Sequence, residues 1–352
     1  MEKKLYKGNQ AIAEAAIQAG CRYYFGYPIT PQNEIGEYLS KALPAVGGTF
    51  IQAESEVGAI NMVYGAAACG ARVMTSSSGL GIALKQEGIS NLCGAEIPAV
   101  IVNICRAGPG LGSIGPSQAD YNQMTKGGGP GDYHMLVYAP DTVQEMVQLT
   151  QEAFEKADAY RNPAAILADG ILGQMMANVQ IPHATEIKPP PVKKWALGQP
   201  DKKTYFSSLR TNNEELERHN LDLREKYDLM KRTETRIQLT DTEDADLVLV
   251  AYGICARVAL KTQEMAKSDG LKIGVARPIT LWPFPYDDIY RAAKNAKAVL
   301  CVEMSDGQMM ADVKLALKGS KPIDLYSRFG GNLPEAKDVY EKVKRMLSEA
   351  HG

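Results

Sequence analysis

The sequence predicts an α/β protein with two doubly wound parallel-sheet domains joined by a long linker. The chain has 352 residues, which is more than a single hydrophobic core usually serves. Short apolar runs alternate with helical patterns in residues 1–180 and again in residues 241–352, an order typical of parallel sheets. Between these two domains, residues 181–240 include a triple proline at 189–191 that favours an extended linker.

The predicted strands of the first domain are short apolar runs, and helical patterns follow most of them. The strands are expected at residues 22–25, 50–53, 72–74, 99–105, 135–138 and 164–168. The helices are expected at residues 10–19, 31–43, 57–69, 85–92 and 142–157. Asn9 and Asp141 are expected to cap two of these helices, because short polar side chains accept hydrogen bonds from free backbone N–H groups. Pro28 and Pro31 exclude regular structure from GYPITPQNEI, which we interpret as a shaped loop.

The second part of the chain resumes this alternation after one charged helix. Residues 212–233 predict an exposed helix with a narrow packing stripe of Leu216, Leu223 and Tyr227. Strands are then expected at residues 245–252, 272–276 and 298–303, and helices at residues 253–266, 306–317 and 334–347. The proline-rich segment 277–285 is expected to be a rigid turn.

Composition and charge exclude several classes of protein. The net charge is −2, whereas nucleic-acid binding requires a clustered basic face. No apolar run approaches the roughly 20 residues of a membrane helix, and the amino terminus has no signal-peptide pattern, so we expect a cytoplasmic protein without a membrane partner. The cysteines never form a CxxC pair, so we predict buried free thiols and no metal site. They stand at positions 21, 69, 93, 105, 255 and 301.

Residues 52–106 contain the strongest candidate site. Glu54 and Glu56 directly precede a helical pattern rich in glycine and alanine, and a Thr-Ser-Ser-Ser-Gly turn is expected at residues 75–79. Arg106 stands at the carboxyl end of a buried strand, and ligands of parallel α/β sheets bind at such ends. Glu56 and Arg106 are therefore candidates for a base and an anion clamp in one crevice. The alternative interpretation is a helix-capping acid and a surface arginine.

A glycine-rich segment suggests a second hypothesis, a dinucleotide-dependent oxidoreductase. Gly110, Gly112 and Gly115 match the GxGxxG pattern and follow a strand. That fingerprint must open a helix whose N-terminus binds the pyrophosphate. Here Pro109 precedes the run and Pro116 ends it, so we expect a long, shaped loop instead. Tight binding of NAD by the isolated chain would favour the dinucleotide hypothesis.

Several motifs resemble one family when they are taken in this order. GYPITPQNEI, QAESEVGAINMVYGAA, the strand that ends at Arg106, and PSQADY are similar to the alpha-type subunit of 2-oxoacid:ferredoxin oxidoreductases. The resemblance extends through RPITLWPFP and the pair Gly307 and Gln308. It implies a pyrimidine-type thiamine diphosphate-binding fold followed by a transketolase C-terminal-like domain. TPQNE, AESE and KGGGPGDY are most similar to the branched-chain 2-oxoisovalerate type, with the 2-oxoglutarate type as the alternative.

The resemblance also implies roles for individual residues. Glu56 would be the catalytic acid that hydrogen-bonds the aminopyrimidine ring, with Glu54 as the alternative for that contact. Thr30 and Arg106 would bind the 2-oxoacid. Three further residues would contact the cofactor: Pro28, Ser78 and Gly79. The chemistry fits independently, because this cofactor needs a carboxylic acid against a ring nitrogen and a substrate carboxylate suits a planar arginine.

The implied reaction is the coenzyme A-dependent oxidative decarboxylation of a 2-oxoacid, 3-methyl-2-oxobutanoate for the branched-chain type, with reduction of ferredoxin. The chain has no GDG motif followed by Asn, which would hold the diphosphate and Mg²⁺, and no cysteine set for an iron–sulfur cluster. Expected partners are a beta-type subunit with the diphosphate-binding domain, a small ferredoxin-like iron–sulfur subunit and, as an option, a gamma-type subunit. The family often has Asn where Met304 or Ser305 stands, so the second domain is expected to be structural and oligomeric. A third hypothesis is a non-catalytic assembly subunit.

Overall fold

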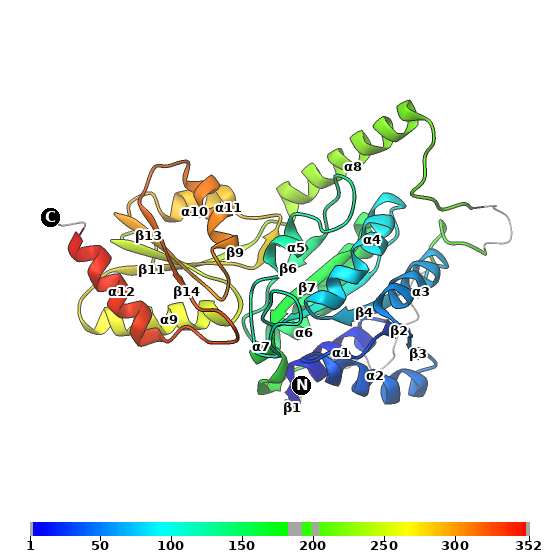
Figure 1. The fold of residues 1–352 in the computed structure, drawn as a ribbon, viewed down its shortest axis with the longest axis horizontal. Helices are drawn as coiled ribbons and strands as arrows, with labels where there is room; N and C mark the ends of the chain where they lie inside the picture. The colour runs from blue at the N-terminus through cyan, green and yellow to red at the C-terminus, as the bar shows by residue number, and fades with distance from the viewer. Residues whose placement is uncertain (1–2, 182–191, 199–203, 350–352) are drawn as a thin grey trace.

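The computed structural model describes residues 3–181, 192–198 and 204–349. These residues form two α/β units that lie side by side, each built on one main sheet (Figure 1). The predicted fold class is confirmed. The proline run at 189–191 lies outside the described residues.

The first unit is built on a seven-stranded sheet in the order β12-β6-β7-β5-β4-β2-β3, parallel except at its β12 edge. Its strands are β2 Tyr23–Gly26, β3 Thr49–Gln52, β4 Val73–Ser77, β5 Val100–Cys105, β6 Leu136–Tyr138, β7 Ala164–Asp169 and β12 Thr280–Trp282. The inner strands are parallel and buried along their length, and their polar residues, among them Ser77 and Asn103, are buried with them. A separate antiparallel pair joins β1 Lys4–Lys7 to β8 Met176–Val179.

Helices cover this sheet, and two groups of them pack together. The helices are α1 Gly8–Gln18, α2 Asn33–Ala45, α3 Glu56–Ala68, α4 Leu80–Gly94, α5 Tyr121–Thr125, α6 Val143–Tyr160 and α7 Gly170–Gln174. Helix α1 packs against α2 and α6, whereas α3 packs against α4. Because β4 and β5 run parallel with Ser77 beside Asn103, the residues that follow both strands emerge at the same edge of the sheet.

The second unit is built on a five-stranded sheet in the order β14-β13-β10-β11-β9, with only the β9 edge antiparallel among its described strands. Its strands are β9 Ile237–Thr240, β10 Leu247–Val250, β11 Ile273–Pro278, β13 Ala298–Glu303 and β14 Ile323–Ser327. Its helices are α9 Gly253–Ser268, α10 Tyr286–Ala292, α11 Gln308–Leu317 and α12 Ala336–Glu349. Helix α8, Asn213–Thr233, precedes this unit and runs along the upper edge of the first one in the view of Figure 1.

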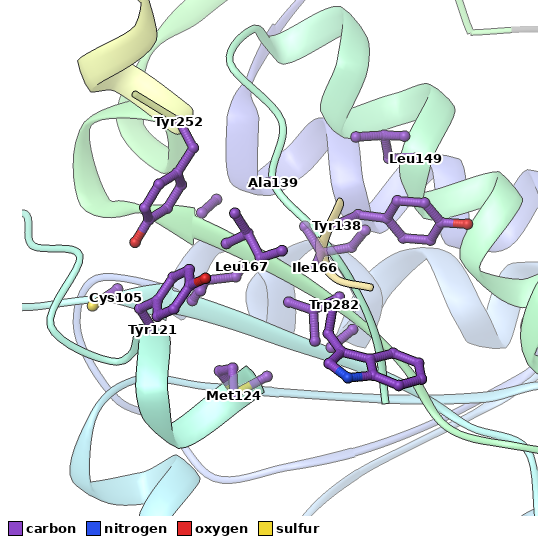
Figure 2. Close-up of a cluster of buried hydrophobic side chains, with 14 of the residues drawn as sticks. Cys105, Tyr121, Met124, Tyr138, Ala139, Leu149, Ile166, Leu167, Tyr252 and Trp282 are labelled. Carbon is purple, nitrogen blue, oxygen red and sulfur yellow. The ribbon is translucent and has the colours of Figure 1, made fainter. Parts of the chain in front are cut away.

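One strand crosses from the second half of the chain into the first sheet. The expectation of a rigid turn at residues 277–285 is wrong at its centre, because β12 pairs there antiparallel with β6. Trp282 of this strand stacks on His134 at a ring distance of 4.5 Å, and Tyr227 of α8 contacts its edge. Figure 2 shows Trp282 below Tyr138 in this core, and Tyr252 above Tyr121 where the units also meet. The two units are therefore joined by shared core as well as by the chain.

Two expected helix caps are wrong. Asn9 lies inside α1 and is fully buried, where its amide donates to the Pro31 carbonyl at 2.7 Å and to Glu34 at 2.8 Å. The cap of α6 is Thr142, whose side chain accepts from the Glu145 N–H at 3.1 Å. Asp141 instead pairs with Arg277 of β11 at 3.2 Å. At both positions the polar side chain bonds a residue that is distant in sequence instead of capping the helix.

Three further expectations change in detail. Residues 75–77 belong to strand β4, so only Ser78 and Gly79 form the turn. Helix α8 buries Leu223 and Tyr227 as expected, but Leu216 is exposed. Cys69 is exposed, whereas the other five cysteines are buried free thiols as predicted.

Searches for membrane spans and metal clusters find neither within the described residues. No helix there combines enough length with enough apolar character to cross a membrane. No group of three or more His, Cys, Asp or Glu side chains is arranged to hold a metal ion in those ranges.

Candidate active site

Glu56 is the first residue of α3, and its side chain is 5% exposed. Ser55 caps this helix by accepting from the Gly58 N–H at 3.0 Å, which fixes where the helix begins. A Cβ atom on Gly81 would lie 2.6 Å from Glu56 Oε1, so the missing side chain of Gly81 makes room for the carboxyl group. Within the described part of the chain no hydrogen bond reaches this carboxyl group. Glu56 is thus a buried acid whose carboxyl group has no hydrogen-bond partner among the described residues.

Glu54 occupies a different environment, although it is only two residues away. Its side chain is exposed, and its carboxylate accepts from the Ser55 hydroxyl at 3.2 Å. A new polar ligand stabilises a carboxylate in water only a little, because water already solvates it. The same ligand stabilises a buried carboxylate without a partner much more. The structure therefore separates the two acids, since Glu56 is buried and Glu54 is exposed.

Lys85 of α4 is a residue that the sequence analysis missed. It is fully buried, and its ammonium donates to the backbone carbonyl of Glu56 at 3.5 Å. Burial lowers the pKa of Lys85 to about 8, and the charge of Glu56 opposes that shift. A signal was present in the sequence, because Lys85 lies at helical spacing from Ile82 and Ile89, which face the core.

Arg106 and Thr30 meet at the carboxyl edge of the sheet. The Arg106 guanidinium donates to the Thr30 carbonyl at 3.2 Å and to the Leu111 carbonyl at 3.1 Å. The Thr30 hydroxyl accepts from the Asn33 amide at 3.4 Å. Two of the five N–H groups of Arg106 are used by these bonds, which leaves three for an anionic ligand. Gly79 lies alongside, since a Cβ there would be 3.7 Å from Arg106 Cγ.

Asp120 is a second residue missed by the sequence analysis. Its carboxylate accepts from the Gly79 N–H at 3.1 Å and from the Asn103 amide at 3.0 Å. Burial raises the pKa of Asp120, while the bond from Asn103 and the charge of Arg106 act in the opposite direction. Asp120 thereby ties the end of β5 to the residue that begins α4. It stands in the PSQADY motif, which carried the family resemblance but suggested no role.

A cavity of about 590 Å³ opens where these groups meet the second unit. It is lined by Gly79, Arg106 and Asp120 from the first unit and by Met304, Ser305 and Gln308 from the second. Glu56 does not line this cavity, because the N-terminus of α4 lies between it and Arg106. Pro28 lines a separate cavity of about 310 Å³ with Tyr24 and Gln32. Of the predicted site residues, the structure thus brings Thr30, Arg106 and Gly79 together and leaves Pro28 apart.

Buried hydroxyl groups complete the region between Glu56 and Arg106. The hydroxyls of Ser77 and Ser78 are buried and have no hydrogen-bond partner among the described residues. Buried polar groups are nearly always paired in folded proteins. An acid, two hydroxyls without a partner among the described residues, and a glycine therefore lie together at the start of α4.

The second unit holds the segment that carries Asp120. Gln118 donates to the Tyr252 carbonyl at 2.8 Å, and its side chain and backbone both bond the backbone of Met304 at 3.0 Å. Gln308 donates to the Ala119 carbonyl at 2.7 Å and accepts from the Asn122 N–H at 2.8 Å. Met304 takes part through its backbone alone, so this clamp does not depend on which side chain stands at that position.

We expect Gln308→Ala to destabilise the junction between the two units. Two hydrogen bonds are lost, each with a net value of about 0.5–1.5 kcal/mol, so unfolding should become easier by about 1–3 kcal/mol. Urea unfolding of the isolated chain, followed by tryptophan fluorescence, measures the effect because Trp282 lies at the junction. Leu315→Ala, at an exposed position of the same helix, is the control. Equal midpoints for both variants would show that the clamp does not stabilise the chain.

The GxGxxG segment lacks the structural context of a dinucleotide site. Gly110 and Gly112 have left-handed φ angles of +65° and +53° and lie in a loop. The next helix, α5, begins only at Tyr121 and has 5 residues. No helix N-terminus among the described residues therefore follows Gly115 directly, as a bound pyrophosphate would require.

Comparison with known proteins gives matches to one group of enzymes. Residues 14–238 match the family model described as pyruvate flavodoxin/ferredoxin oxidoreductase, thiamine diphosphate-binding. Residues 245–339 match core domain II of pyruvate:ferredoxin oxidoreductase.

Individual relatives match over nearly the whole chain. Ketoisovalerate oxidoreductase subunit VorB of Methanothermobacter marburgensis is 50% identical over 100% of both chains. 2-Oxoglutarate synthase subunit KorA of the same organism is 34% identical over 98% of this chain and 99% of its own. Among solved structures, 2-oxoglutarate:ferredoxin oxidoreductase from Magnetococcus marinus has a TM-score of 0.88 at 24% identity. That match covers 98% of this chain and 65% of the other, and it supports the fold alone.

Proposed function

The chain belongs to the pyruvate flavodoxin/ferredoxin oxidoreductase family, and from this premise we propose that it forms the pyrimidine side of a thiamine diphosphate site in an enzyme for branched-chain 2-oxoacids. The chain is a subunit of a 2-oxoacid:ferredoxin oxidoreductase. The observation that carries the choice of substrate is the 50% identity to a ketoisovalerate oxidoreductase subunit over the full length of both chains. Identity to the 2-oxoglutarate synthase subunit is lower, at 34%.

The residues around Glu56 fit the aminopyrimidine end of this cofactor. When bound, thiamine diphosphate supplies the nucleophilic carbon that decarboxylation of a 2-oxoacid requires. In our proposal the Glu56 carboxyl group donates a hydrogen bond to the ring nitrogen and exchanges a proton with it. Its burial, its lack of a partner among the described residues and the space left by Gly81 support this role. The unpaired hydroxyls of Ser77 and Ser78 are further candidates for contacts with the cofactor.

Arg106 and Thr30 are proposed to bind the carboxylate of the 2-oxoacid. The guanidinium is held in place by two backbone carbonyls and retains N–H groups for a ligand. A carboxylate accepts two parallel N–H bonds from such a planar group, which fixes its orientation as well as its position. Residues of the second unit also line the cavity beside Arg106. We therefore propose that the second unit forms one wall of the substrate site, in addition to any role in oligomerisation.

The remaining machinery is proposed to reside in partner subunits. The sequence has no GDG motif followed by Asn for the diphosphate and Mg²⁺ and no cysteine set for an iron–sulfur cluster. We therefore propose a beta-type partner for the diphosphate end, an iron–sulfur subunit for electron transfer to ferredoxin, and coenzyme A as the acceptor of the acyl group. The free carboxyl group of Glu56 supports a site that is completed by a second chain.

Substrate preference in the complex purified from its native cell tests the proposal. We expect kcat/KM for 3-methyl-2-oxobutanoate to exceed that for 2-oxoglutarate by on the order of 10–100-fold. Arg106 is the one basic side chain among the described residues that line the cavity, and a second carboxylate without a charged partner forgoes about 1.5–3 kcal/mol. The measurement is coenzyme A-dependent reduction of viologen with each 2-oxoacid. Preference for 2-oxoglutarate would overturn the choice of substrate, and NAD reduction without viologen reduction would overturn the reaction.

A further inference from the structure

We propose that Lys85 is a positioning residue for the reaction: its buried ammonium group stabilises the carboxylate that Glu56 becomes when it releases its proton. Glu56 is thereby made a better proton donor to its ligand. This inference rests on the proposed role of Glu56. It assigns Lys85 a function in the reaction, which the packing of helix α4 alone does not require.

The geometry joins the two residues across one helix pair. Helices α3 and α4 pack together, with Glu56 at the start of α3 and Lys85 inside α4. Lys85 is fully buried and donates to the Glu56 backbone carbonyl at 3.5 Å. Within the described residues it forms no ion pair, so two of its three N–H groups have no protein partner. The ammonium therefore contacts the backbone of Glu56 and forms no ion pair with any described residue.

Charge in a dry environment explains why this placement matters. Attraction between opposite charges is several times stronger in a protein interior than in water. Burial lowers the pKa of Lys85, and Glu56 is the one charged group among the described residues that raises it again. Attraction between two charges is mutual, so the same ammonium acts on the carboxylate of Glu56.

A purely structural role for Lys85 makes the opposite prediction about stability. A buried ammonium with one long hydrogen bond is costly, and an apolar side chain of similar length fills the same space without that cost. If the ammonium itself stabilises the fold through its hydrogen bond, Lys85→Met destabilises the chain. If it serves Glu56, Lys85→Met stabilises the chain and impairs proton release from Glu56.

The first experiment follows Glu56 in the isolated full-length chain, without cofactor. Carbon-13 NMR of chains with labelled glutamate side chains gives the titration of each carboxyl group, and the signal lost in Glu56→Gln identifies Glu56. We expect Lys85→Met to move the midpoint of the Glu56 titration to higher pH by about one unit or more. Lys261→Met removes an exposed lysine of α9 and should leave the midpoint of the Glu56 titration unchanged. An unchanged midpoint in Lys85→Met overturns the proposal.

The second experiment measures thermal stability against pH. The pKa of Lys85 is about 8 in the folded chain against 10.5 as the ordinary value, so between these pH values the unfolded chain binds more protons. The wild type therefore gains stability from this group as pH rises from about 8 to 10.5. Lys85→Met should melt at a higher temperature than wild type at pH 7, and that difference should shrink across this window. A lower melting temperature at pH 7 with no dependence on pH would show that Lys85 is structural.

The assembled complex provides the functional readout. Lys85→Met should slow proton exchange at the reactive carbon of thiamine diphosphate about tenfold, which is the rate equivalent of one pH unit. Lys85→Arg keeps the charge and should restore part of the rate. Because the titration of Glu56 is measured without cofactor, a failure of this inference is distinct from a failure of the proposed role of Glu56. Normal exchange in Lys85→Met, beside slow exchange in Glu56→Gln, would reject Lys85 and retain Glu56.

Discussion

Glu56→Gln should reduce 2-oxoacid-dependent viologen reduction by the assembled complex about 10²–10⁴-fold, the usual contribution of a positioned acid–base group. Glutamine preserves the size of the side chain in the space left by Gly81 but cannot release a proton to its ligand. The chain should still fold and assemble, because no hydrogen bond among the described residues is lost with the carboxylate. The measurement is steady-state turnover beside proton exchange at the reactive carbon of the cofactor.

Glu54→Gln is the matched control for this experiment. Glu54 is exposed, and its one side-chain contact in the described structure is the bond from the Ser55 hydroxyl. We therefore expect turnover within about threefold of wild type. A substitution at an exposed position such as Glu54 changes stability little, and so the assembled complex should keep its activity. If Glu54→Gln is the impaired variant, or if Glu56→Gln exchanges the proton at the wild-type rate, then our assignment of the acid is wrong.

Most strands of the two main sheets were predictable because burial leaves a direct mark on sequence, whereas β1, β8, β9 and β14 were not predicted. Strands β5, β7 and β13 are buried on both faces and are mostly apolar, with an asparagine inside β5 and an acidic residue at the end of β7 and of β13. The helices between them were found from their spacing, and their ends were misplaced by a few residues. The errors at Asn9 and Asp141 have one cause, since capping is a local rule and both side chains bind groups from other elements.

Strand β12 was not predictable from the residues that form it. It has three residues, and prolines stand on both sides of it, at Pro278 and Pro283, so local pattern indicates a turn. Its pairing with β6 involves residues about 140 positions apart and depends on how the two units pack. The contact of Trp282 with His134 and Tyr227 arises in the same way.

The candidate site was predictable where it followed the sheet and not where it depended on contacts between elements. Arg106 follows β5, so it was expected at the carboxyl edge, whereas the role of Thr30 came from the family resemblance. Asp120 lies in a long loop whose course is set by Gln118 and Gln308, which bond to the opposite unit. Lys85 was not predictable because lysines of helices are mostly exposed, and only its contact with α3 buries this one.

Arg106→Lys should weaken the apparent affinity of the assembled complex for its 2-oxoacid about 10–100-fold. A charge-assisted hydrogen bond contributes about 1.5–3 kcal/mol, and lysine cannot reproduce the bidentate contact of a guanidinium. Two separate nitrogens of Arg106 bond the Thr30 and Leu111 carbonyls, and the single nitrogen of lysine does not reproduce that spacing, so the attachment of the loop beside the cavity is weakened. The measurement is KM for 3-methyl-2-oxobutanoate, with KM for coenzyme A as the internal reference that should stay unchanged.

Arg106→Lys affects the site in two ways, by loosening the loop that carries Leu111 and by removing a contact with the substrate carboxylate. The two effects predict different changes in KM, and the control variants distinguish them. Leu111→Ala retains the backbone carbonyl that Arg106 bonds and removes only an exposed apolar side chain, so it should not change the affinity for the carboxylate group itself. Arg257→Lys alters an exposed arginine of α9 and should change neither Michaelis constant. If Arg106 acts through the carboxylate, Arg106→Lys weakens binding of every 2-oxoacid by a similar factor, because the carboxylate is common to all of them. An unaltered KM, or a loss confined to substrates with one kind of side chain, would instead place Arg106 in the wall of the cavity.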